Sequence, residues 1–347
     1  MTSTVENAKP QFFPYKRTIE ADDLVIAYMN RDNMIALVVQ PGAIYNNRFG
    51  IYHHDNFIGK PFGAKVVSHT GRGFMYLLHP TPELWTLVLP HRTQILYQPD
   101  ISLITAYLEL RPGAIVLESG TGSGSFSHSL ARTVAPHGHL YTFEFHEARA
   151  EQARAEFAAH GLSHLITLAC RDACKEGFAI EDKVDAVFLD LPAPWEAIPF
   201  AKRAFKQHQM GRIACFSPCI EQVQRTCETL RALGFRDVRT FECLQRSYSP
   251  RTQTLLTVEQ TIERAKSRAA QAKKPFVGQK RKSEVDQEAV EEEEEEAKNA
   301  AVEEEATTTA NDVMPRTITT TTLPAESRGH TSYLTFATFM PVLSSET

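Results

Sequence analysis

Hydrophobic and polar positions alternate in two different rhythms along the chain, and the change falls near Asp100. After Asp100, short apolar runs alternate with segments in which apolar residues recur every three or four positions. This pattern predicts strands at 114–118, 140–144, 165–169, 185–189, 212–216 and 237–245. It predicts helices at 100–110, 126–135, 147–159, 196–207 and 219–233. Such alternation indicates an α/β fold with a doubly wound, Rossmann-like parallel sheet.

Two further regions complete the predicted fold. Residues 333–340, YLTFATFM, form a strong strand pattern that we expect to pair antiparallel with 237–245. Between residues 20 and 90, turn residues separate short apolar segments, and we expect strands at 25–29, 34–39, 74–78 and 85–89. Strands this short and closely spaced predict a small N-terminal antiparallel β domain.

Charge is unevenly distributed along the chain, although the net charge is only −5. Residues 264–282 contain eight basic residues and no acidic one, and residues 284–305 contain twelve acidic residues and one lysine. Such blocks cannot bury a core, which predicts a disordered insert at 259–328. The expected domains are therefore a β domain at 1–95 and a main domain formed by 96–258 and 329–347, interrupted by the insert.

Composition excludes several classes of protein. There is no run of 18 apolar residues, and the first residues lack the apolar core of a signal peptide, so a soluble intracellular protein without a membrane span is expected. The six cysteines form no paired C-x-x-C knuckles and are expected to be reduced thiols, with no metal site. The basic clusters at 273–274 and 280–282 resemble a nuclear-import signal or a nucleic-acid patch, and a solvated linker is the alternative.

A glycine-rich turn follows the first strand of the main domain. Gly120, Gly122 and Gly124 alternate between Glu118 and a helix, which lets the backbone turn sharply and approach a ligand closely. The dinucleotide fingerprint G-x-G-x-x-G does not fit, because serine occupies the positions where its last glycine is needed. The pattern acid-x-G-x-G-x-G suits a ligand with a ribose and no pyrophosphate, such as S-adenosylmethionine. A tight turn without a ligand is the alternative.

Acidic residues end two other predicted strands. Glu144 ends the second strand, where a carboxylate can accept both hydroxyls of a ribose or cap the next helix. Asp190 follows the fourth strand and precedes Pro192, Pro194 and Trp195. The prolines stiffen this loop, and Trp195 can wall a pocket, stack on a base or pack in the core. Because the carboxyl ends of parallel strands meet at one edge, these groups are expected to share one crevice.

The predicted chemistry depends on Asp190. Its loop resembles the Asn/Asp-Pro-Pro-aromatic loop of enzymes that methylate the amino group of adenine, without the asparagine or the adjacent prolines. Methylation of a ring nitrogen of adenine creates a cation shared with the exocyclic amine, and a fixed carboxylate that accepts from this amine binds the transition state most tightly. Asp172 and Ala173 are candidates for contacts with the adenine of the donor, and Arg149 for another donor contact. A turn-forming aspartate and a surface arginine are the alternatives.

Several longer motifs make the chain similar to a known family. They are FGAK at 62–65, HPTPELWT at 79–86, LPHRTQILY at 89–97, ESGTGSGS at 118–125, TFEFH at 142–146, FLDLPAPW at 188–195 and FSPCIEQV at 216–223. With them the chain closely resembles the catalytic subunits of the eukaryotic tRNA adenine-N1 methyltransferases that modify the T-loop, over residues 59–246 and 329–338. The charged insert departs from this pattern.

The resemblance implies S-adenosylmethionine as donor, a tRNA adenosine as acceptor and a heterotetramer of two catalytic and two non-catalytic subunits. The basic cluster adds the expectation of a nuclear location. From the motifs and the resemblance together, the residues expected at the donor are Leu96, Gly120, Gly122, Ser123, Gly124, Ser125, Glu144, Arg149, Asp172, Ala173 and Asp190, with Asp190 catalytic. Those expected at the tRNA are His79, Pro80, Thr81, Arg92, Thr93, Gln94, Trp195, Ser217, Pro218 and Cys219.

Three alternative functions suit the sequence less well. A non-catalytic RNA-binding paralogue would be expected to lack the glycine turn or Asp190, and both are present. A methyltransferase for mRNA, a protein or a small molecule shares the donor site, but a flat heterocycle with an amine suits the Asp190 loop better. An NAD enzyme is opposed by the spacing of the glycines.

Overall fold

The computed structural model describes residues 9, 11–13, 15–244, 248–257, 260–266, 317–322 and 332–341. The chain divides into two compact units, Met1–Gln245 with Arg328–Thr347, and Arg246–Ser327. None of the described helices is long and apolar enough to cross a membrane. All predicted site residues belong to the first unit.

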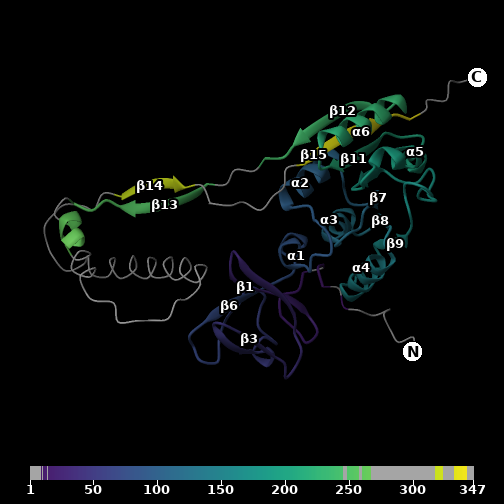
Figure 1. The fold of residues 1–347 in the computed structure, drawn as a ribbon. Coiled ribbons are helices and arrows are strands. Elements are labelled where there is room, and N and C mark those ends of the chain that lie inside the picture. Colours follow the sequence, from purple (N-terminus) through teal and green to yellow (C-terminus); the bar gives the residue numbers. More distant parts are fainter. Residues whose placement is uncertain are drawn as a thin grey trace, which may run out of the picture. The chain divides into compact units, whose positions relative to one another are not determined.

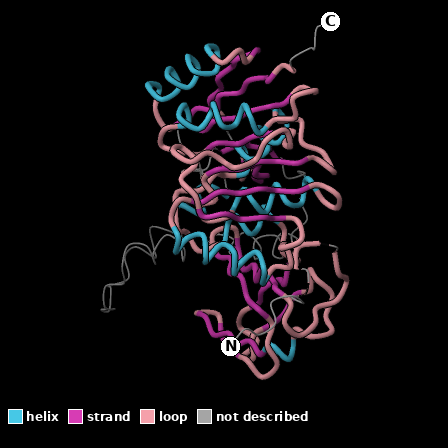
Figure 2. The backbone as a smooth tube through the Cα atoms, turned by 90° about the vertical axis from the view of Figure 1, so that its right-hand side faces the viewer, coloured by secondary structure: helices cyan, strands magenta, loops and turns pink. Residues whose placement is uncertain are grey.

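A seven-stranded sheet in the order β12-β15-β11-β10-β7-β8-β9 forms the centre of the first unit (Figure 1, Figure 2). Strands β7 to β11 pair in parallel, whereas β15 runs antiparallel to both of its neighbours, β11 and β12. This confirms the predicted parallel sheet and the antiparallel pairing of its last strand. The pairing of β15 with β11 was not anticipated. The strands are β7 (Ile115–Ser119), β8 (His139–Glu144), β9 (Ile166–Cys170), β10 (Ala186–Leu189), β11 (Gly211–Ser217), β12 (Arg236–Glu242) and β15 (Tyr333–Phe339).

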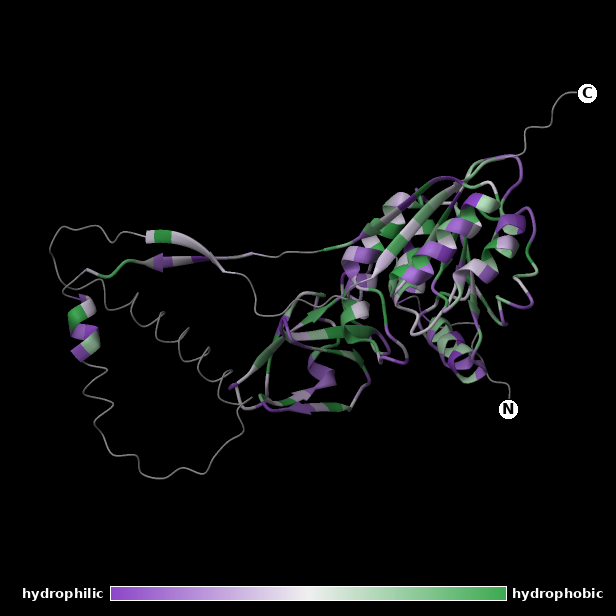
Figure 3. Cartoon of the chain, turned by 45° about the horizontal axis from the view of Figure 1, so that its top comes forward, coloured by the Kyte–Doolittle hydropathy of each residue, from purple (hydrophilic) through white to green (hydrophobic). Residues whose placement is uncertain are grey.

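Helices cover both faces of this sheet because its strands are apolar on both sides. Val116 packs with the helices of one face and its neighbour Leu117 with those of the other, as the alternation of side chains along a strand requires. In Figure 3 these helices carry both hydrophilic and hydrophobic residues. The first face carries α2 (Gln98–Tyr107), α3 (Ser125–Val134) and α4 (Glu147–Ala159), and the second carries α5 (Pro194–Ala204) and α6 (Ile220–Ala232).

The N-terminal region forms a small antiparallel sheet, as predicted, with the strand order β2-β1-β6-β5. Strands β3 and β4 form a separate hairpin, and Val25, Tyr52 and Leu77 belong to a core of their own. The elements are β1 (Leu24–Asn30), β2 (Asn33–Val38), β3 (Ile44–Asn47), β4 (Gly50–His53), a 3-10 turn at His54–Asn56, β5 (Lys65–Val67) and β6 (Phe74–Leu78).

The prediction of a strand at 85–89 is wrong, because these residues lie in or directly after helix α1 (Pro82–Val88). The Thr81 hydroxyl accepts a hydrogen bond from the backbone N–H of Leu84, and a proline occupies the first turn. Both features favour a helix start. Trp85 and Leu89, four positions apart, are buried together on one side of this helix.

The second unit contains one described pair of antiparallel strands, β13 (Ser249–Thr254) and β14 (Thr317–Thr322). β14 lies inside the region predicted to be a disordered insert, and its run of threonines has a β-propensity that favours a strand. All of the acidic block and most of the basic block lie outside the described residues. The prediction for those blocks stays a prediction.

Candidate active site

The strand order brings the glycine turn and two predicted carboxylates to one edge of the sheet. β7 lies between β10 and β8, with Ser119 opposite Leu189 on one side and Phe143 on the other. Glu144 is the last residue of β8, and Asp190 directly follows β10. The turn after β7 therefore lies between these two acids, as the parallel topology requires.

The glycine turn fits closely against its neighbours. Gly120 has a φ of 98°, and a Cβ at this position would collide with the carbonyl oxygen of Asp190. A Cβ on Gly122 would lie 2.7 Å from the hydroxyl oxygen of Thr93. The N–H of Asp190 donates to the carbonyl of Ser119 at 2.8 Å, which fixes the Asp190 loop beside the turn. Glycine, which has no Cβ and adopts a positive φ without strain, fits both positions.

Hydrogen bonds hold Glu144 in one orientation. Its Oε1 accepts from Arg149 Nη2 at 2.7 Å and from the His146 N–H at 3.0 Å, and its Oε2 accepts from the Gly122 N–H at 3.0 Å. These bonds offset the cost of burying the carboxylate. The alternative role as a helix cap is not what is observed, since the N-cap residue of α4 is His146. Glu144 is tied to the glycine turn instead.

Two further carboxylates line the crevice, and their surroundings oppose ionisation. Burial, with the charge of Glu144 nearby, raises the pKa of Asp190 to about 7. Burial also raises the pKa of Glu118 to about 7, despite hydrogen bonds that it accepts from Ser127 at 2.6 Å and Thr142 at 2.8 Å. Glu118 was not among the predicted site residues, although its place two positions before the first glycine was a signal for it.

The carboxylate cluster of Glu118, Glu144 and Asp190 has little positive charge around it. Among the described residues, Arg149 is the only base that forms an ion pair with the cluster, through Glu144. A cationic ligand would favour the ionised acids, and a ligand with a ribose would use the fixed oxygens of Glu144. S-adenosylmethionine has a sulfonium cation and a ribose, so these residues fit it.

The predicted donor residues divide into two groups. One group lines a cavity of about 30 Å³ at the crevice. Gly124, Glu144 and Arg149 are not among its lining residues, but Gly124 follows the lining residue Ser123, and Glu144 accepts hydrogen bonds from the Gly122 N–H and from Arg149. Asp172 belongs to the second group, because its Oδ1 accepts from the N–H groups of Cys174 at 3.1 Å and Lys175 at 3.3 Å, which is the turn-forming role. Ala173 is buried beside it. The cavity is lined by Thr93, Gln94, Ile95, Leu96, Glu118, Gly120, Thr121, Gly122, Ser123, Ser125, Phe126, Phe188 and Asp190.

The residues predicted to contact tRNA differ in accessibility. Gln94, Pro218 and Cys219 are exposed, whereas Pro80 and Ser217 are buried. The remaining members are partly buried and have partners within the protein. His79 packs against Tyr15 and Phe62, and Thr81 caps helix α1. The Arg225 guanidinium lies over the ring of Trp195, and the backbone N–H groups of Arg92 and Thr93 donate to Ser123.

Potential ligand atoms of the buried His128 and His160 and of the partly buried Glu156 lie within 4.8 Å of one another beside the glycine turn. His128 Nδ1 lies 2.6 Å from the carbonyl oxygen of Gly124, and its Nε2 lies 2.9 Å from His160 Nδ1. Burial lowers the pKa of His128 to about 4 and that of His160 to about 2, so both rings are neutral. The two neutral imidazoles hydrogen-bond to each other, and His128 also bonds to the carbonyl of Gly124, so their role is to support the glycine turn.

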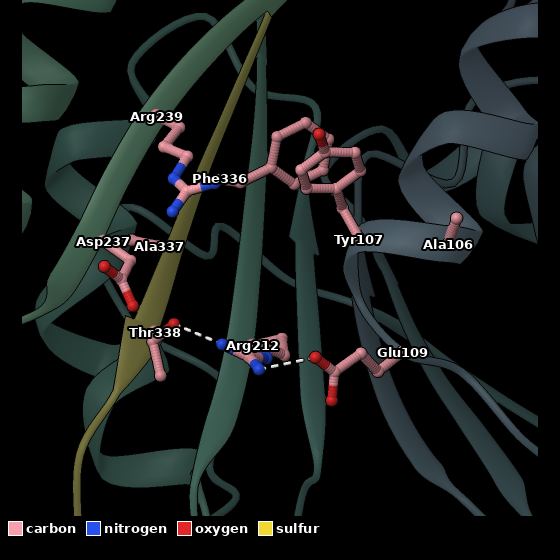
Figure 4. A pocket seen from close by; sticks show the side chains of 9 residues that line it. All are labelled: Ala106, Tyr107, Glu109, Arg212, Asp237, Arg239, Phe336, Ala337 and Thr338. Atoms are coloured by element: carbon pink, nitrogen blue, oxygen red, sulfur yellow. Dashed lines mark hydrogen bonds and ion pairs between the residues drawn. The ribbon is translucent and has the colours of Figure 1, made fainter.

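A larger groove, of about 380 Å³, lies beside the outer strands and helix α2 (Figure 4). None of its lining residues lines the cavity at the glycine turn, and Arg212 lies between two of them. Arg212 hydrogen-bonds to Glu109 on one side and to Thr338 on the other, as Figure 4 shows. The groove is lined by Ala106, Tyr107, Glu109, Arg212, Asp237, Arg239, Phe336, Ala337 and Thr338.

Known proteins resemble this chain in sequence and in fold. Residues 73–339 match the family described as tRNA methyltransferase complex GCD14 subunit. The chain is 42% identical over 367 residues to the tRNA (adenine(58)-N(1))-methyltransferase catalytic subunit of Cryptococcus neoformans, which covers 96% of this chain and 84% of the relative. It is 49% identical over 241 residues to the corresponding subunit of Dictyostelium discoideum, with 68% of this chain and 77% of the relative covered.

Two solved structures share the fold. The tRNA (m1A58) methyltransferase TrmI from Aquifex aeolicus has a TM-score of 0.62 and 19% identity, with 94% of this chain and 100% of that chain covered. A SAM-dependent O-methyltransferase from Thermotoga maritima has a TM-score of 0.66 and 24% identity, with 95% of this chain and 97% of that chain covered. By its sequence match over most of its length, the chain belongs to the GCD14 family of tRNA methyltransferase complex subunits.

Proposed function

We propose that this chain is a catalytic subunit that transfers a methyl group from S-adenosylmethionine to N1 of an adenosine in the T-loop of tRNA. The observation that carries the proposal is the carboxylate cluster around the glycine turn, because it suits a cationic donor and a base that becomes cationic. The names of relatives at 42% and 49% identity support adenine N1 as the acceptor.

Asp190 has the central role in the proposed reaction. When bound, S-adenosylmethionine supplies an electrophilic methyl group on a positively charged sulfur. The N1 lone pair of the adenine forms the new bond as the carbon–sulfur bond breaks, and the positive charge passes to the purine. Ionised Asp190 accepts a hydrogen bond from the exocyclic amine, whose share of positive charge grows toward the transition state. Glu144 orients the ribose of the donor, and the glycine turn lets the backbone approach it.

Methyl transfer from labelled S-adenosylmethionine to unmodified tRNA tests this function, with the product nucleoside identified by digestion and mass spectrometry. The full chain with its partner subunit should form N1-methyladenosine. Asp190→Ala should lower turnover by at least about 100-fold, since it removes a group that acts on the developing charge. Folding should be nearly normal, and Glu151→Ala, an exposed acid on α4, is the matched control. Full activity in Asp190→Ala would refute the role of Asp190, and no transfer by the wild type would refute the function.

The active form is proposed to be a complex of two catalytic and two non-catalytic subunits. The family description names a complex, and outside residues 259–327 acidic and basic residues nearly balance, so this chain alone offers tRNA little net positive charge. At moderate salt, the isolated chain should bind tRNA more weakly than the complex. Equal affinity of the two would contradict the proposal, and light scattering on the purified complex gives the stoichiometry.

A nuclear location is proposed from the basic clusters at 273–274 and 280–282, which lie outside the described residues. Replacing Lys280, Arg281 and Lys282 with alanine in a fluorescent fusion of the full chain should move the signal out of the nucleus. A fusion that keeps its nuclear signal after this change would contradict the proposal.

A further inference from the structure

Arg92 joins the glycine turn to helix α4. Its guanidinium donates to the carbonyl oxygen of Ser123 at 2.9 Å and to Glu156 Oε2 at 3.0 Å. The backbone N–H groups of Arg92 and Thr93 donate to the Ser123 hydroxyl at 2.9 and 3.1 Å. Because Ser123 is buried, its polar atoms depend on these partners rather than on water.

The Arg92 side chain points into the protein. It is 14% exposed, its partner Glu156 is 13% exposed, and each of its two terminal nitrogens has a protein acceptor. An arginine that binds a phosphate has to present the two terminal nitrogens of its guanidinium to the ligand. The role implied by the resemblance, a tRNA contact, is therefore not the one that this geometry favours.

The glycine turn is held from two sides. On one side, the Gly122 N–H donates to Glu144 at 3.0 Å, and on the other side Thr93 lies too close for a Cβ at Gly122. Ser123 is the next residue and bonds to Arg92. Loss of the Arg92 contact would free the turn to move relative to Glu144. A displacement of about 1 Å in such a site costs about 100-fold in function.

We propose that Arg92 is a positioning residue for the methyl donor, because its guanidinium fixes the Ser123 carbonyl, and with it the glycine turn, against Glu156 of α4. The proposal rests on the proposed function, since the donor is the ligand of that turn. Glu156 balances the charge of Arg92, so the arginine does not neutralise the carboxylate cluster. Arg92 acts on the affinity for the donor and not on the reacting atoms.

Arg92→Met and Arg92→Lys test this role in the full chain, purified with its partner subunit. Arg92→Met should raise the Kd and KM for S-adenosylmethionine about 10- to 100-fold. The KM for tRNA and the kcat at saturating donor should change less than about threefold, because neither depends on Arg92 once the donor is in place. Arg92→Lys should recover part of the affinity, since an ammonium can reach Ser123 or Glu156 but does not reproduce the two terminal nitrogens of the guanidinium.

Control variants separate positioning from folding. His91→Ala changes an exposed neighbour and should leave both KM values unaltered. If Arg92→Met does not fold, as judged by thermal unfolding, Glu156→Gln is the second variant. It should raise the KM for S-adenosylmethionine by a smaller factor and leave the KM for tRNA unchanged. A raised KM for tRNA with unchanged donor affinity overturns the proposal, as does donor binding by Arg92→Met equal to wild type. A wild-type protein that binds no S-adenosylmethionine refutes the proposed function instead.

Discussion

The crevice at the carboxyl ends of β7, β8 and β10 and the groove beside the outer strands both carry charged side chains, but they differ in how charge is balanced. In the groove, Arg212 is held between Glu109 and Thr338. In the crevice, Glu118 and Asp190 have no basic partner among the described residues, and burial raises the pKa of each to about 7. The groove is much larger, about 380 Å³ against about 30 Å³. Unbalanced charge, and not volume, distinguishes the candidate site.

Gly120→Ala is the change with the largest expected effect on the crevice. A Cβ would collide with the carbonyl of Asp190 at a residue whose φ of 98° already disfavours alanine. Donor binding and methyl transfer should fall by at least about 100-fold. Gly113→Ala is the control, because Gly113 has a similar φ of 89° but open space around its Cβ position. Isothermal titration with S-adenosylmethionine should show normal binding for the control, and equal loss in both variants would contradict this explanation.

The affinity for S-adenosylmethionine should rise with pH. Asp190 and Glu118, each with a pKa of about 7 in the free protein, lose their protons between pH 6 and pH 8, and a cation favours the ionised acids. One such group gives an increase of about tenfold over this range. Titration calorimetry at several pH values measures it, and Asp190→Asn should leave only the part of the rise that Glu118 causes. An affinity that falls with pH would rule out the cluster as the source of donor binding.

Asp190→Asn should stabilise the fold at high pH. Burial raises the pKa of Asp190 from an ordinary value of 3.8 to about 7, so the folded chain retains a proton that the unfolded chain releases above pH 4. Stability therefore falls as pH rises from about 4 to about 7, and the amide removes this cost. At pH 8 the gain should be about 4 kcal/mol, or on the order of 10 °C in Tm, and it should vanish near pH 4. A variant less stable than wild type at pH 8 would count against this interpretation.

Arg212→Met should have the smallest effect on function, because it acts in the groove. The variant loses hydrogen bonds to Glu109 and Thr338, which should cost about 1 kcal/mol of stability. Thermal unfolding should show a drop of a few degrees, while the Kd for S-adenosylmethionine and turnover stay within about twofold, the scatter expected of a distant, independent site. A large loss of donor affinity would remove the distinction between the two regions.

The parts of the site that depend on topology were predictable from sequence. Glu144 and Asp190 end apolar runs, and parallel strands bring such ends to one edge. The antiparallel β15 was also predictable, because its apolar run stands apart from the charged residues before it. In these cases the local pattern of apolar and polar residues was enough to predict the element and its approximate place in the sheet.

Contacts between distant segments were not predictable. Arg92 and Glu156 are 64 positions apart, and nothing near either residue in the sequence indicates the other. The prediction of a strand at 85–89 is wrong because an i, i+4 pair of apolar residues in a short run fits a strand as well as a helix, and here the cap at Thr81 favours the helix. Glu118 was overlooked because its role depends on burial, which only the fold defines.

The place of β15 in the sheet has a consequence for synthesis of the chain. β15 fills the gap between β11 and β12, yet residues 243–332 separate it from β12 along the sequence. At normal elongation rates the ribosome needs roughly 5 to 20 s to add those 90 residues. A nascent chain whose earlier strands have already paired would present an unpaired edge of β11 during that interval, and such edges recruit foreign strands. This exposure would end when Tyr333 and the residues after it emerge.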